Sequence, residues 1–234
     1  MPHPIWEKNC LIAPSLIALD HCNFEQQVRL VEQGGIDLLH IDILDGHFSP
    51  SLPLGIDTVM QLRAKTELPF DAHIMVTKPD YFVDAMLDIG VEQLTLQCET
   101  TPHLDRMIHR IKSRGVRAGV ALKPATTLAG IDYALEIADC ILLMLINPGF
   151  AGVSTERQVP YAARKICELR ERIDARNSGA VIELDGRVSR QDIERYGGQT
   201  AQIFVAGSTC LDREHLAESL QSLADLQNDI QDGI

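Results

Sequence analysis

The chain has 234 residues, of which 45% are hydrophobic and 23% are charged, so it can bury a sizeable core and is too apolar to be disordered. Its formal net charge of -12 argues against nucleic-acid and anionic-membrane partners, although backbone N–H groups at helix N-termini could still hold one phosphate. The N-terminal residues do not show the pattern of a secretory signal, and no apolar stretch reaches membrane-spanning length, so we expect a soluble cytoplasmic protein. The six cysteines form no Cys-x-x-Cys pair, so we expect them to be reduced and buried.

Short β-branched or aliphatic runs alternate with longer amphipathic segments from one end of the chain to the other. In chain order we expect strand 11–14, helix 24–33, strand 37–41, strand 70–75, helix 81–89, strand 91–96, helix 104–113, strand 116–122, strand 140–145, helix 161–175, strand 180–184, helix 192–196, strand 202–206 and a last helix from Arg213 onward. Glycines such as Gly90 and Gly115 stand between a helix and the next strand, where they suit left-handed C-caps.

This alternation is typical of right-handed β-α-β units around a parallel sheet. About eight such units in a chain of this length favour a closed barrel over an open sheet. An open dinucleotide-binding sheet would need Gly-x-Gly-x-x-Gly after its first strand, whereas residues 13–20 read Ala-Pro-Ser-Leu-Ile-Ala-Leu-Asp. We therefore predict an α/β fold, a single (β/α)8 TIM barrel that occupies residues 1–234 as one domain.

Four polar side chains fall near the ends of predicted strands that are otherwise apolar. His40 and Asp42 alternate with isoleucines and so share one face of the second strand. His73 lies on the third strand, and Asp185 follows the seventh. Two imidazole nitrogens and two carboxylate oxygens suit Zn²⁺, Fe²⁺ or Mn²⁺ better than Mg²⁺ or Ca²⁺. Because the carboxyl ends of barrel strands carry the chemistry, the pattern favours one such metal there.

Each of these residues also has an ordinary explanation. A lone histidine on a strand is more often a hydrogen-bonding residue than a ligand, and Asp45 and Asp185, which precede glycines, could be turn residues. The convergence of four suitable groups on one mouth favours the metal, because isolated charges there would be costly without a cation.

Three consecutive late loops are rich in glycine, namely residues 147–152 (NPGFAG), 185–189 (DGRVS) and 205–209 (VAGST). Glycine lets backbone N–H groups approach an anion closely, and the late loops of such barrels commonly bind phosphate. Pro-Gly and Gly-Ser are ordinary turns when taken singly, so it is their repetition that favours a phosphate site.

With these residues assembled, the sequence resembles the ribulose-phosphate 3-epimerase family over about residues 11–211. The matching stretches are 12–15 (IAPS), 40–48 (HIDILDGHF), 71–76 (DAHIMV), 144–150 (MLINPGF), 183–186 (ELDG) and 205–208 (VAGS). They fall in order at the expected strand ends, which makes the combination highly specific.

The resemblance implies an enzyme that binds one divalent transition metal (Zn, Fe or Mn) and inverts C3 of a ketose phosphate, either ribulose 5-phosphate and xylulose 5-phosphate or a related sugar phosphate. The metal ligands would be the residues that match the family's own: His40, Asp42, His73 and Asp185. Asp42 and Asp185 would double as catalytic acid and base, while the metal polarises the carbonyl and stabilises a cis-enediolate. A homo-oligomer is also implied.

By the same resemblance, residues at the strand ends and in the glycine-rich loops would contact the substrate: Ser15, His73, Met75, Met144, Gly149, Phe150, Ala151, Gly152, Gly186, Arg187, Gly207 and Ser208. Ser15 matches a serine that contacts the substrate. Met75 and Met144 match thioethers near the enediolate, although both could simply fill the core.

The sequence departs from the family pattern around the pocket and keeps every proposed ligand. Residues 97–99 (QCE) stand for the usual His-Pro-Glu, residues 151–153 (AGV) for Gly-Gly-Gln, and Arg187 for the second glycine of Asp-Gly-Gly. Smaller changes are Ala18, Leu44 and residues 49–51 (SPS), in place of a serine, a methionine and Val-Pro-Asn.

Arg187 has two interpretations: it could add a charge-assisted fork to the phosphate, or its bulk could fill the phosphate seat. Because the departures gather on the pocket, we hypothesise an epimerase with an altered substrate, namely another ketopentose, tetrulose or hexulose phosphate.

Two rival functions remain. A sugar-phosphate lyase on a related barrel would resemble Asp-x-Lys-x-x-Asp on the second strand, but residues 42–45 read Asp-Ile-Leu-Asp and lack the lysine. A non-catalytic or regulatory sugar-phosphate-binding barrel would not need the four ligands, so their presence speaks against it.

Overall fold

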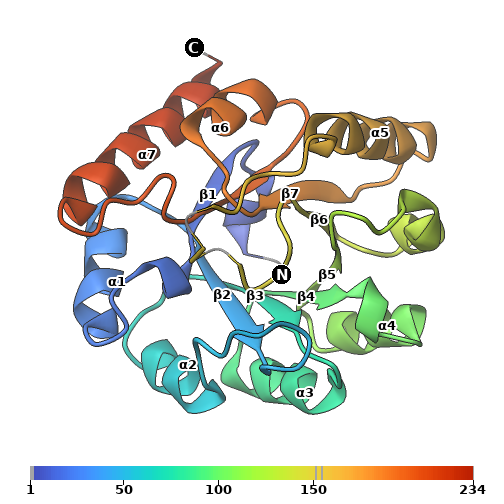
Figure 1. Cartoon of the computed structure of the whole chain (residues 1–234), viewed down its shortest axis with the longest axis horizontal. Helices are drawn as coiled ribbons and strands as arrows, with labels where there is room; N and C mark the ends of the chain where they lie inside the picture. The colour runs from blue at the N-terminus through green and yellow to red at the C-terminus, as the bar shows by residue number, and fades with distance from the viewer. Residues whose placement is uncertain (1–2, 151, 154, 234) are drawn as a thin grey trace.

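The computed structural model describes residues 3–150, 152–153 and 155–233, and its centre is one parallel sheet rolled into a barrel (Figure 1). The eight strands are β1 Leu11–Pro14, β2 Leu39–Leu44, β3 Phe70–Met75, β4 Gln93–Gln97, β5 Arg117–Leu122, β6 Cys140–Met144, β7 Val181–Asp185 and β8 Ile203–Ala206. Seven of the eight neighbouring pairs form parallel ladders, in the order β1-β8-β7-β6-β5-β4-β3-β2. A parallel bridge between Ser15 and His40 brings β1 beside β2 and nearly closes the ring. The predicted (β/α)8 barrel is confirmed.

Helices surround the sheet in Figure 1 and alternate with the strands along the chain. Those described are α1 Phe24–Gln33, α2 Ile56–Arg63, α3 Asp80–Ile89, α4 Leu104–Ser113, α5 Ala162–Ala175, α6 Arg190–Tyr196 and α7 Leu216–Asp232. Two 3-10 turns, Leu128–Ile131 and Ala134–Glu136, take the place of a helix between β5 and β6. No helix in the described ranges is both long and apolar enough to cross a membrane.

Most expected elements lie within one or two residues of the observed ones, and the exceptions have local causes. The second strand was expected over residues 37–41, but pairing with β3, from Leu39 opposite Phe70 to Leu44 opposite Met75, carries it further. Helix α2 was not predicted, because it is only eight residues long and follows a proline-containing segment. The expectation of buried cysteines is wrong for Cys22 and Cys167, which are exposed.

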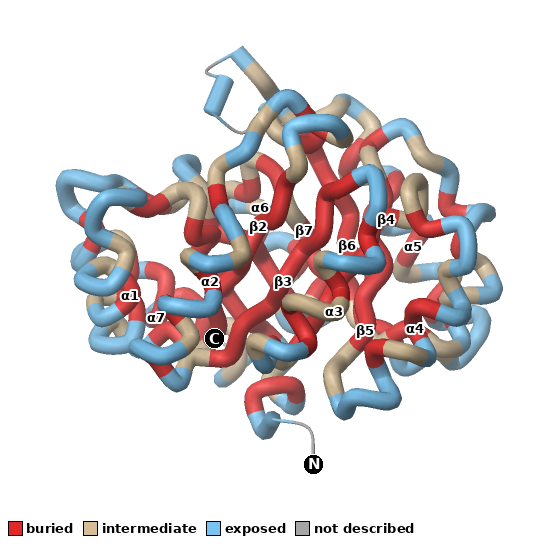
Figure 2. Tube along the Cα trace, turned by 90° about the horizontal axis from the view of Figure 1, so that it is seen from below, coloured by how far each residue is buried: buried red, intermediate tan, exposed pale blue. Residues whose placement is uncertain are grey.

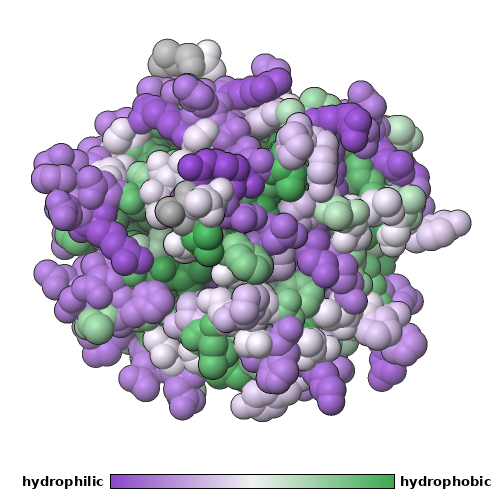
Figure 3. Space-filling view, in the orientation of Figure 1, coloured by the Kyte–Doolittle hydropathy of each residue, from purple (hydrophilic) through white to green (hydrophobic). Residues whose placement is uncertain are grey.

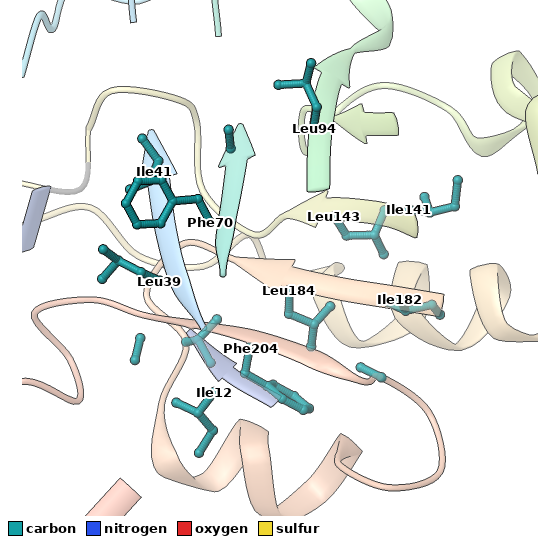
Figure 4. Packing of buried hydrophobic residues seen from close by; sticks show 14 of the residues in the cluster. Ile12, Leu39, Ile41, Phe70, Leu94, Ile141, Leu143, Ile182, Leu184 and Phe204 are labelled. Carbon is teal, nitrogen blue, oxygen red and sulfur yellow. The ribbon is translucent and has the colours of Figure 1, made fainter. Parts of the chain in front are cut away.

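The main apolar core lies between the barrel and its helices. Side chains that point outward from the strands, among them Ile41, Leu94 and Leu184, pack there at 0% exposure (Figure 4). Figure 2 shows the buried strands in red at the centre and exposed segments mostly on the helices and loops. Because successive residues of a strand face opposite sides, this outward packing turns the intervening residues into the barrel interior.

The amino end of the barrel is closed by an apolar plug. Ile5 and Trp6 of an N-terminal 3-10 turn pack with residues at the starts of the strands, including Leu11 and Leu38. The Arg117 guanidinium lies over the Trp6 ring, 4.6 Å from its centroid. The interior is therefore sealed at this end, and its access lies at the carboxyl ends of the strands.

Candidate active site

The four predicted ligands meet inside the barrel. His40 and Asp42 come from β2, His73 from β3 and Asp185 from the end of β7, and one ligand atom of each lies within 4.8 Å of the others. Asp42 is opposite His73 in the β2–β3 register, with 3.5 Å between Asp42 Oδ1 and His73 Nδ1. His40 Nε2 lies 3.2 Å from the same oxygen, and Asp185 Oδ2 lies 4.0 Å from His73 Nδ1. The structure thus assembles this set from three strands.

The donor set fits a divalent transition metal. His40 Nδ1 donates a hydrogen bond to Asp71 Oδ2 at 2.7 Å, which leaves Nε2 directed at Asp42. His73 Nδ1 is buried, has no hydrogen-bond partner, and faces both carboxylates. A buried imidazole nitrogen that lacks a hydrogen-bond partner and lies beside two carboxylates has the chemistry and the surroundings of a metal ligand. The residues present could therefore hold such an ion.

The electrostatics of the set also favour a cation. Burial opposes a charge on His40, but the carboxylates of Asp42 and Asp71 outweigh it and raise the pKa of His40 well above its usual value. Burial alone would raise the pKa of Asp42, yet the neighbouring His40 holds it well below its usual range. Burial and the charge of Asp42 raise the pKa of Asp185 to about 6. The cluster thus attracts a positive charge, which a proton or a metal can supply.

A second set of polar side chains, here called the floor network, lies deeper in the barrel and consists of Asp71, Gln93, Arg117, Cys140 and Glu183. Gln93 Nε2 donates to Asp71 Oδ1 at 3.0 Å and to Glu183 Oε2 at 3.1 Å. Cys140 Sγ donates to Glu183 Oε2, and Arg117 Nε donates to Gln93 Oε1. Burial and the charge of Asp71 raise the pKa of Glu183 to about 8. Through the hydrogen bond between Asp71 and His40 Nδ1, the network fixes the orientation of the His40 ring.

A cavity that is partly open to solvent lies above the four-residue cluster. Asp42 and Asp185 line it, whereas His40 and His73 are 0% exposed and lie behind them. In Figure 1 the described parts of the segment between β6 and α5 run across the front of the barrel. Figure 3 shows apolar surface near the centre of the same face with hydrophilic side chains around it. The carboxylates are thus the ligands that a substrate can touch.

Most of the predicted substrate contacts line this cavity. They are Ser15, Met75, Met144, Gly149, Gly152, Gly186, Arg187, Gly207 and Ser208. Phe150 does not line it and is 37% exposed, and Ala151 lies outside the described residues. His73, expected both as a ligand and as a substrate contact, lies beside the carboxylates without reaching the cavity wall.

Two glycines let the loops close around the cavity. Gly149 has φ +83°, and a Cβ there would overlap Ser49 Oγ at 1.5 Å, so the loop after β6 contacts the loop after β2. Gly186 has φ +102°, and a Cβ there would lie 2.7 Å from Ile146 Cγ1. Any larger residue at either position would push these loops apart.

Arg187 adopts a left-handed backbone conformation, φ +55°, at a position where an L side chain is strained. Its Nη2 donates to the carbonyl of Val153, in the loop after β6, at 2.7 Å, and its Nε is buried without a partner. The side chain therefore lies along the cavity wall and keeps a donor available.

Sequence reasoning missed Arg213, which also lines the cavity and donates from Nε to the carbonyl of Ala18 at 2.8 Å. Its loop position before α7 carries no strand or glycine signal, so only the fold brings it to the mouth. Gln97 was noted as a departure but not as a site residue, although it lies 3.0 Å from His73. Among the other lining residues are Ile17, Ala18, Leu44, Ser51, Ile146, Asn147, Val205 and Thr209.

Fold and site together define a TIM barrel with a candidate metal centre at the carboxyl ends of its strands. A model of the ribulose-phosphate 3 epimerase family matches residues 11–211. The chain is 36% identical over 198 residues to ribulose-phosphate 3-epimerase of Bacillus subtilis (strain 168), which covers 84% of this chain and 90% of that one. It is 34% identical over 220 residues to chloroplastic ribulose-5-phosphate-3-epimerase of Arabidopsis thaliana, which covers 93% and 77%. The chain belongs to the ribulose-phosphate 3-epimerase family, and this membership supports a carbohydrate epimerase.

Solved structures with the same fold are more distant in sequence. A crystal structure of KGPDC from Streptococcus mutans superposes with a TM-score of 0.71 at 14% identity, over 95% of this chain and 99% of that one. For 3-keto-L-gulonate-6-phosphate decarboxylase from Vibrio cholerae the TM-score is 0.61 at 12% identity, over 93% and 98%. These likenesses support the barrel and carry no information on activity.

Proposed function

We propose that this protein is a metal-dependent epimerase that inverts C3 of a ketose phosphate. The observation that carries the proposal is the pair of carboxylates, Asp42 on β2 and Asp185 on β7, which line one cavity beside two buried imidazoles. Inversion of a carbon needs one proton carrier on each of its faces, and two carboxylates from different strands supply them.

The proposed reaction conserves protons. One carboxylate takes the proton from C3, and the electron pair of the C–H bond forms a C2=C3 double bond while the carbonyl oxygen becomes the oxyanion of an enediolate. The other carboxylate gives its proton to the opposite face of C3, and the carbonyl forms again. A divalent metal held by His40, Asp42, His73 and Asp185 would polarise the carbonyl.

Neighbouring side chains support the two carboxylates. Ser15 Oγ donates to Asp42 Oδ2 at 2.8 Å, which fixes the orientation of that carboxylate. Met75 and Met144, with Leu44, form a buried apolar cluster next to them. We propose that this cluster covers the reacting carbon and keeps water from exchanging its proton, since a dry site protects a reactive intermediate.

We propose that the phosphate binds at the glycine-rich loops, where Arg187 and Arg213 supply positive charge. Both line the cavity, and each uses one N–H to tie a neighbouring loop. Because a guanidinium has five N–H donors, each can still hold an anion. Because Arg187, Ala18 and Ser51 depart from the family pattern at this end of the cavity, the proposed substrate is a ketopentose, tetrulose or hexulose phosphate other than ribulose 5-phosphate.

The rival functions fit the site less well. A lyase of the related type would need a lysine where Leu44 lines the cavity. A non-catalytic binder would have no reason to keep two carboxylates at the cavity and a fully buried imidazole nitrogen without a partner, because each such group costs folding free energy. Both observations favour the epimerase.

Incubation with a panel of ketose phosphates in deuterated water tests the proposal. Protein loaded with Zn²⁺, Fe²⁺ or Mn²⁺ should incorporate one deuterium at C3 of at least one substrate and form its C3 epimer, and metal-free protein should not. Absence of exchange on every pentulose, tetrulose and hexulose phosphate with each metal would refute the epimerase. If ribulose 5-phosphate exchanges faster than every other substrate in the panel, the proposal of an altered substrate is refuted and the proposal of an epimerase stands.

Four other expectations stay predictions: the single-domain organisation of residues 1–234, the cytoplasmic location, the homo-oligomeric assembly and the absence of nucleic-acid and membrane partners. Light scattering on the purified protein measures the oligomeric state directly.

A further inference from the structure

Gln97, the last residue of β4, makes an unusual contact with the candidate metal centre. Its side chain is 0% exposed, and its Nε2 lies 3.0 Å from His73 Nε2 and 3.0 Å from Met144 Sδ. Its Oε1 is buried and has no hydrogen-bond partner. On the other side of the same imidazole, His73 Nδ1 is also buried without a partner and faces Asp42. One nitrogen of the His73 ring and the amide oxygen of Gln97 beside it therefore both lack a hydrogen-bond partner.

The orientation of this amide decides which nitrogen of His73 can bind a metal. When Nε2 of Gln97 faces the ring, the amide donates a hydrogen bond to His73 Nε2. The proton of the neutral imidazole is then on Nδ1, so Nδ1 has no lone pair to offer a metal on the side that faces the carboxylates. A half-turn of the amide exchanges its nitrogen and oxygen at almost no change of shape. Oε1 then accepts the Nε2 proton of His73, and the Nδ1 lone pair becomes free for an ion.

We propose that Gln97 is a positioning residue that sets the tautomer of His73, so that its amide oxygen makes Nδ1 a metal ligand. The inference rests on the metal-dependent function proposed above. His40 offers the comparison, because the Asp71 carboxylate can only accept from its Nδ1 and so fixes that ring in one tautomer. An amide is neutral and can turn either way, so Gln97 holds His73 less firmly than Asp71 holds His40.

Metal affinity without substrate tests this role. We expect Gln97→Leu to weaken the affinity for Zn²⁺ about tenfold to a hundredfold, as loss of a hydrogen bond to a ligand histidine typically does, when measured by competition with a chromogenic chelator. Gln97→Glu keeps an acceptor at the same place and should bind Zn²⁺ at least as tightly as the wild type. With Co²⁺ as the probe, Gln97→Leu should lose the absorption bands of the wild-type site, and Gln97→Glu should keep them.

Thr95→Val is the matched control. Thr95 precedes Gln97 by two residues on the same face of β4, pairs with His73 in the register, and has an Oγ1 without a hydrogen-bond partner. Its replacement by the isosteric valine should leave Zn²⁺ affinity unchanged. Circular dichroism confirms that each variant is folded before its affinity is compared.

The possible results separate this inference from the proposed function. Equal Zn²⁺ affinity of wild type and Gln97→Leu would overturn the inference and leave the epimerase intact. Equal weakening by Gln97→Leu and Gln97→Glu would assign Gln97 a packing role and overturn it too. A wild type that binds none of Zn²⁺, Fe²⁺ or Mn²⁺ would overturn both, whereas tight binding with the expected variant effects but no epimerisation would overturn the function alone.

Discussion

Two polar clusters inside the barrel contain the same kinds of side chain but differ in their hydrogen bonding. One is the floor network; the other, here called the mouth, consists of the four predicted ligands together with Gln97. Both consist of carboxylates, an imidazole contact and an amide on inward-facing strand positions. In the floor network the Gln93 amide donates to two carboxylates, and the network atom that lacks a hydrogen bond, Glu183 Oε1, lies 3.3 Å from His40 Nδ1. At the mouth, His73 Nδ1 and Gln97 Oε1 have no partner.

This difference separates a group that stabilises the fold from a group kept for chemistry. A buried polar network that makes all but one of its hydrogen bonds, as the floor does, holds its members in one arrangement, whereas a polar atom without a partner costs free energy until a ligand binds it. The mouth therefore depends on what binds there, and the floor does not. Substitutions at the mouth should change activity more than stability, and substitutions in the floor should do the reverse.

The largest expected effect is on catalysis. Asp42→Asn and Asp185→Asn should each lower deuterium exchange at C3 of the preferred substrate by about a thousandfold or more, because each removes a proton carrier and a ligand. Asp45→Asn is the matched control: Asp45 lies three residues beyond Asp42 but only accepts from the turn and from Thr77. Full exchange in both site variants would contradict the two-carboxylate assignment.

The next effect, on stability, tests the floor. Asp71→Ala should lower the free energy of unfolding by about 3 to 5 kcal/mol, because it leaves His40 and Gln93 without their buried acceptor. Urea denaturation of the metal-free protein measures this loss. A cost below about 1 kcal/mol would show that the floor network is not a stabilising unit, since that is the value of an ordinary hydrogen bond.

Sequence patterning predicted the side on which these residues lie but not the layer they occupy. His40, Asp42 and His73 were found because they interrupt apolar strands, and Asp185 because it stands at the end of one. Asp71 and Glu183 lie two residues before His73 and Asp185 and face the same way, so alternation gives all of them one side of the sheet. Depth in the barrel depends on the stagger between strands, which a single sequence does not reveal.

The limits of the sequence are similar elsewhere in the chain. Strand positions followed from apolar runs, but the extent of β2 depended on pairing with β3. The loops that carry Arg187 and Arg213 are set by turns, and Arg213 reaches the cavity only because α7 returns beside α1 and β1. The glycine-rich loops could be recognised from the sequence as a candidate anion site, and Arg187 could be recognised with them, whereas Arg213 required the structure.

A smaller effect on substrate affinity tests the proposed phosphate end of the mouth. Arg187→Gln should raise KM for the phosphorylated substrate about tenfold, the effect of losing one charge-assisted hydrogen bond, with kcat much less affected. Arg213→Gln should act in the same direction. Arg190→Gln, on the exposed start of α6 and paired with Glu194, provides a control that should leave KM unchanged. An unchanged KM in both cavity variants would place the phosphate elsewhere.

The last expected effect, on stability, has the opposite sign from that of Asp71→Ala. Asp185 keeps its proton up to about pH 6 in the folded, metal-free protein, but its pKa in the unfolded chain is about 3.9. Between these values the folded state binds more protons, so this group's contribution to stability falls as pH rises from about 4 to 6 and stays unfavourable above that.

Asp185→Asn removes that unfavourable contribution. At pH 7 the variant should gain on the order of 1 to 3 kcal/mol in the free energy of unfolding, because a shift of two pKa units corresponds to about 2.7 kcal/mol before structural relaxation. The gain should vanish near pH 4, and urea denaturation across pH 4 to 8 measures it. Added Zn²⁺ should make the wild type more stable than the variant, because an ion that binds the folded state stabilises it, and the wild type binds the ion more tightly. A loss of stability in the metal-free variant at pH 7 would mean that mouth and floor are stabilised alike, and the distinction between them would fall.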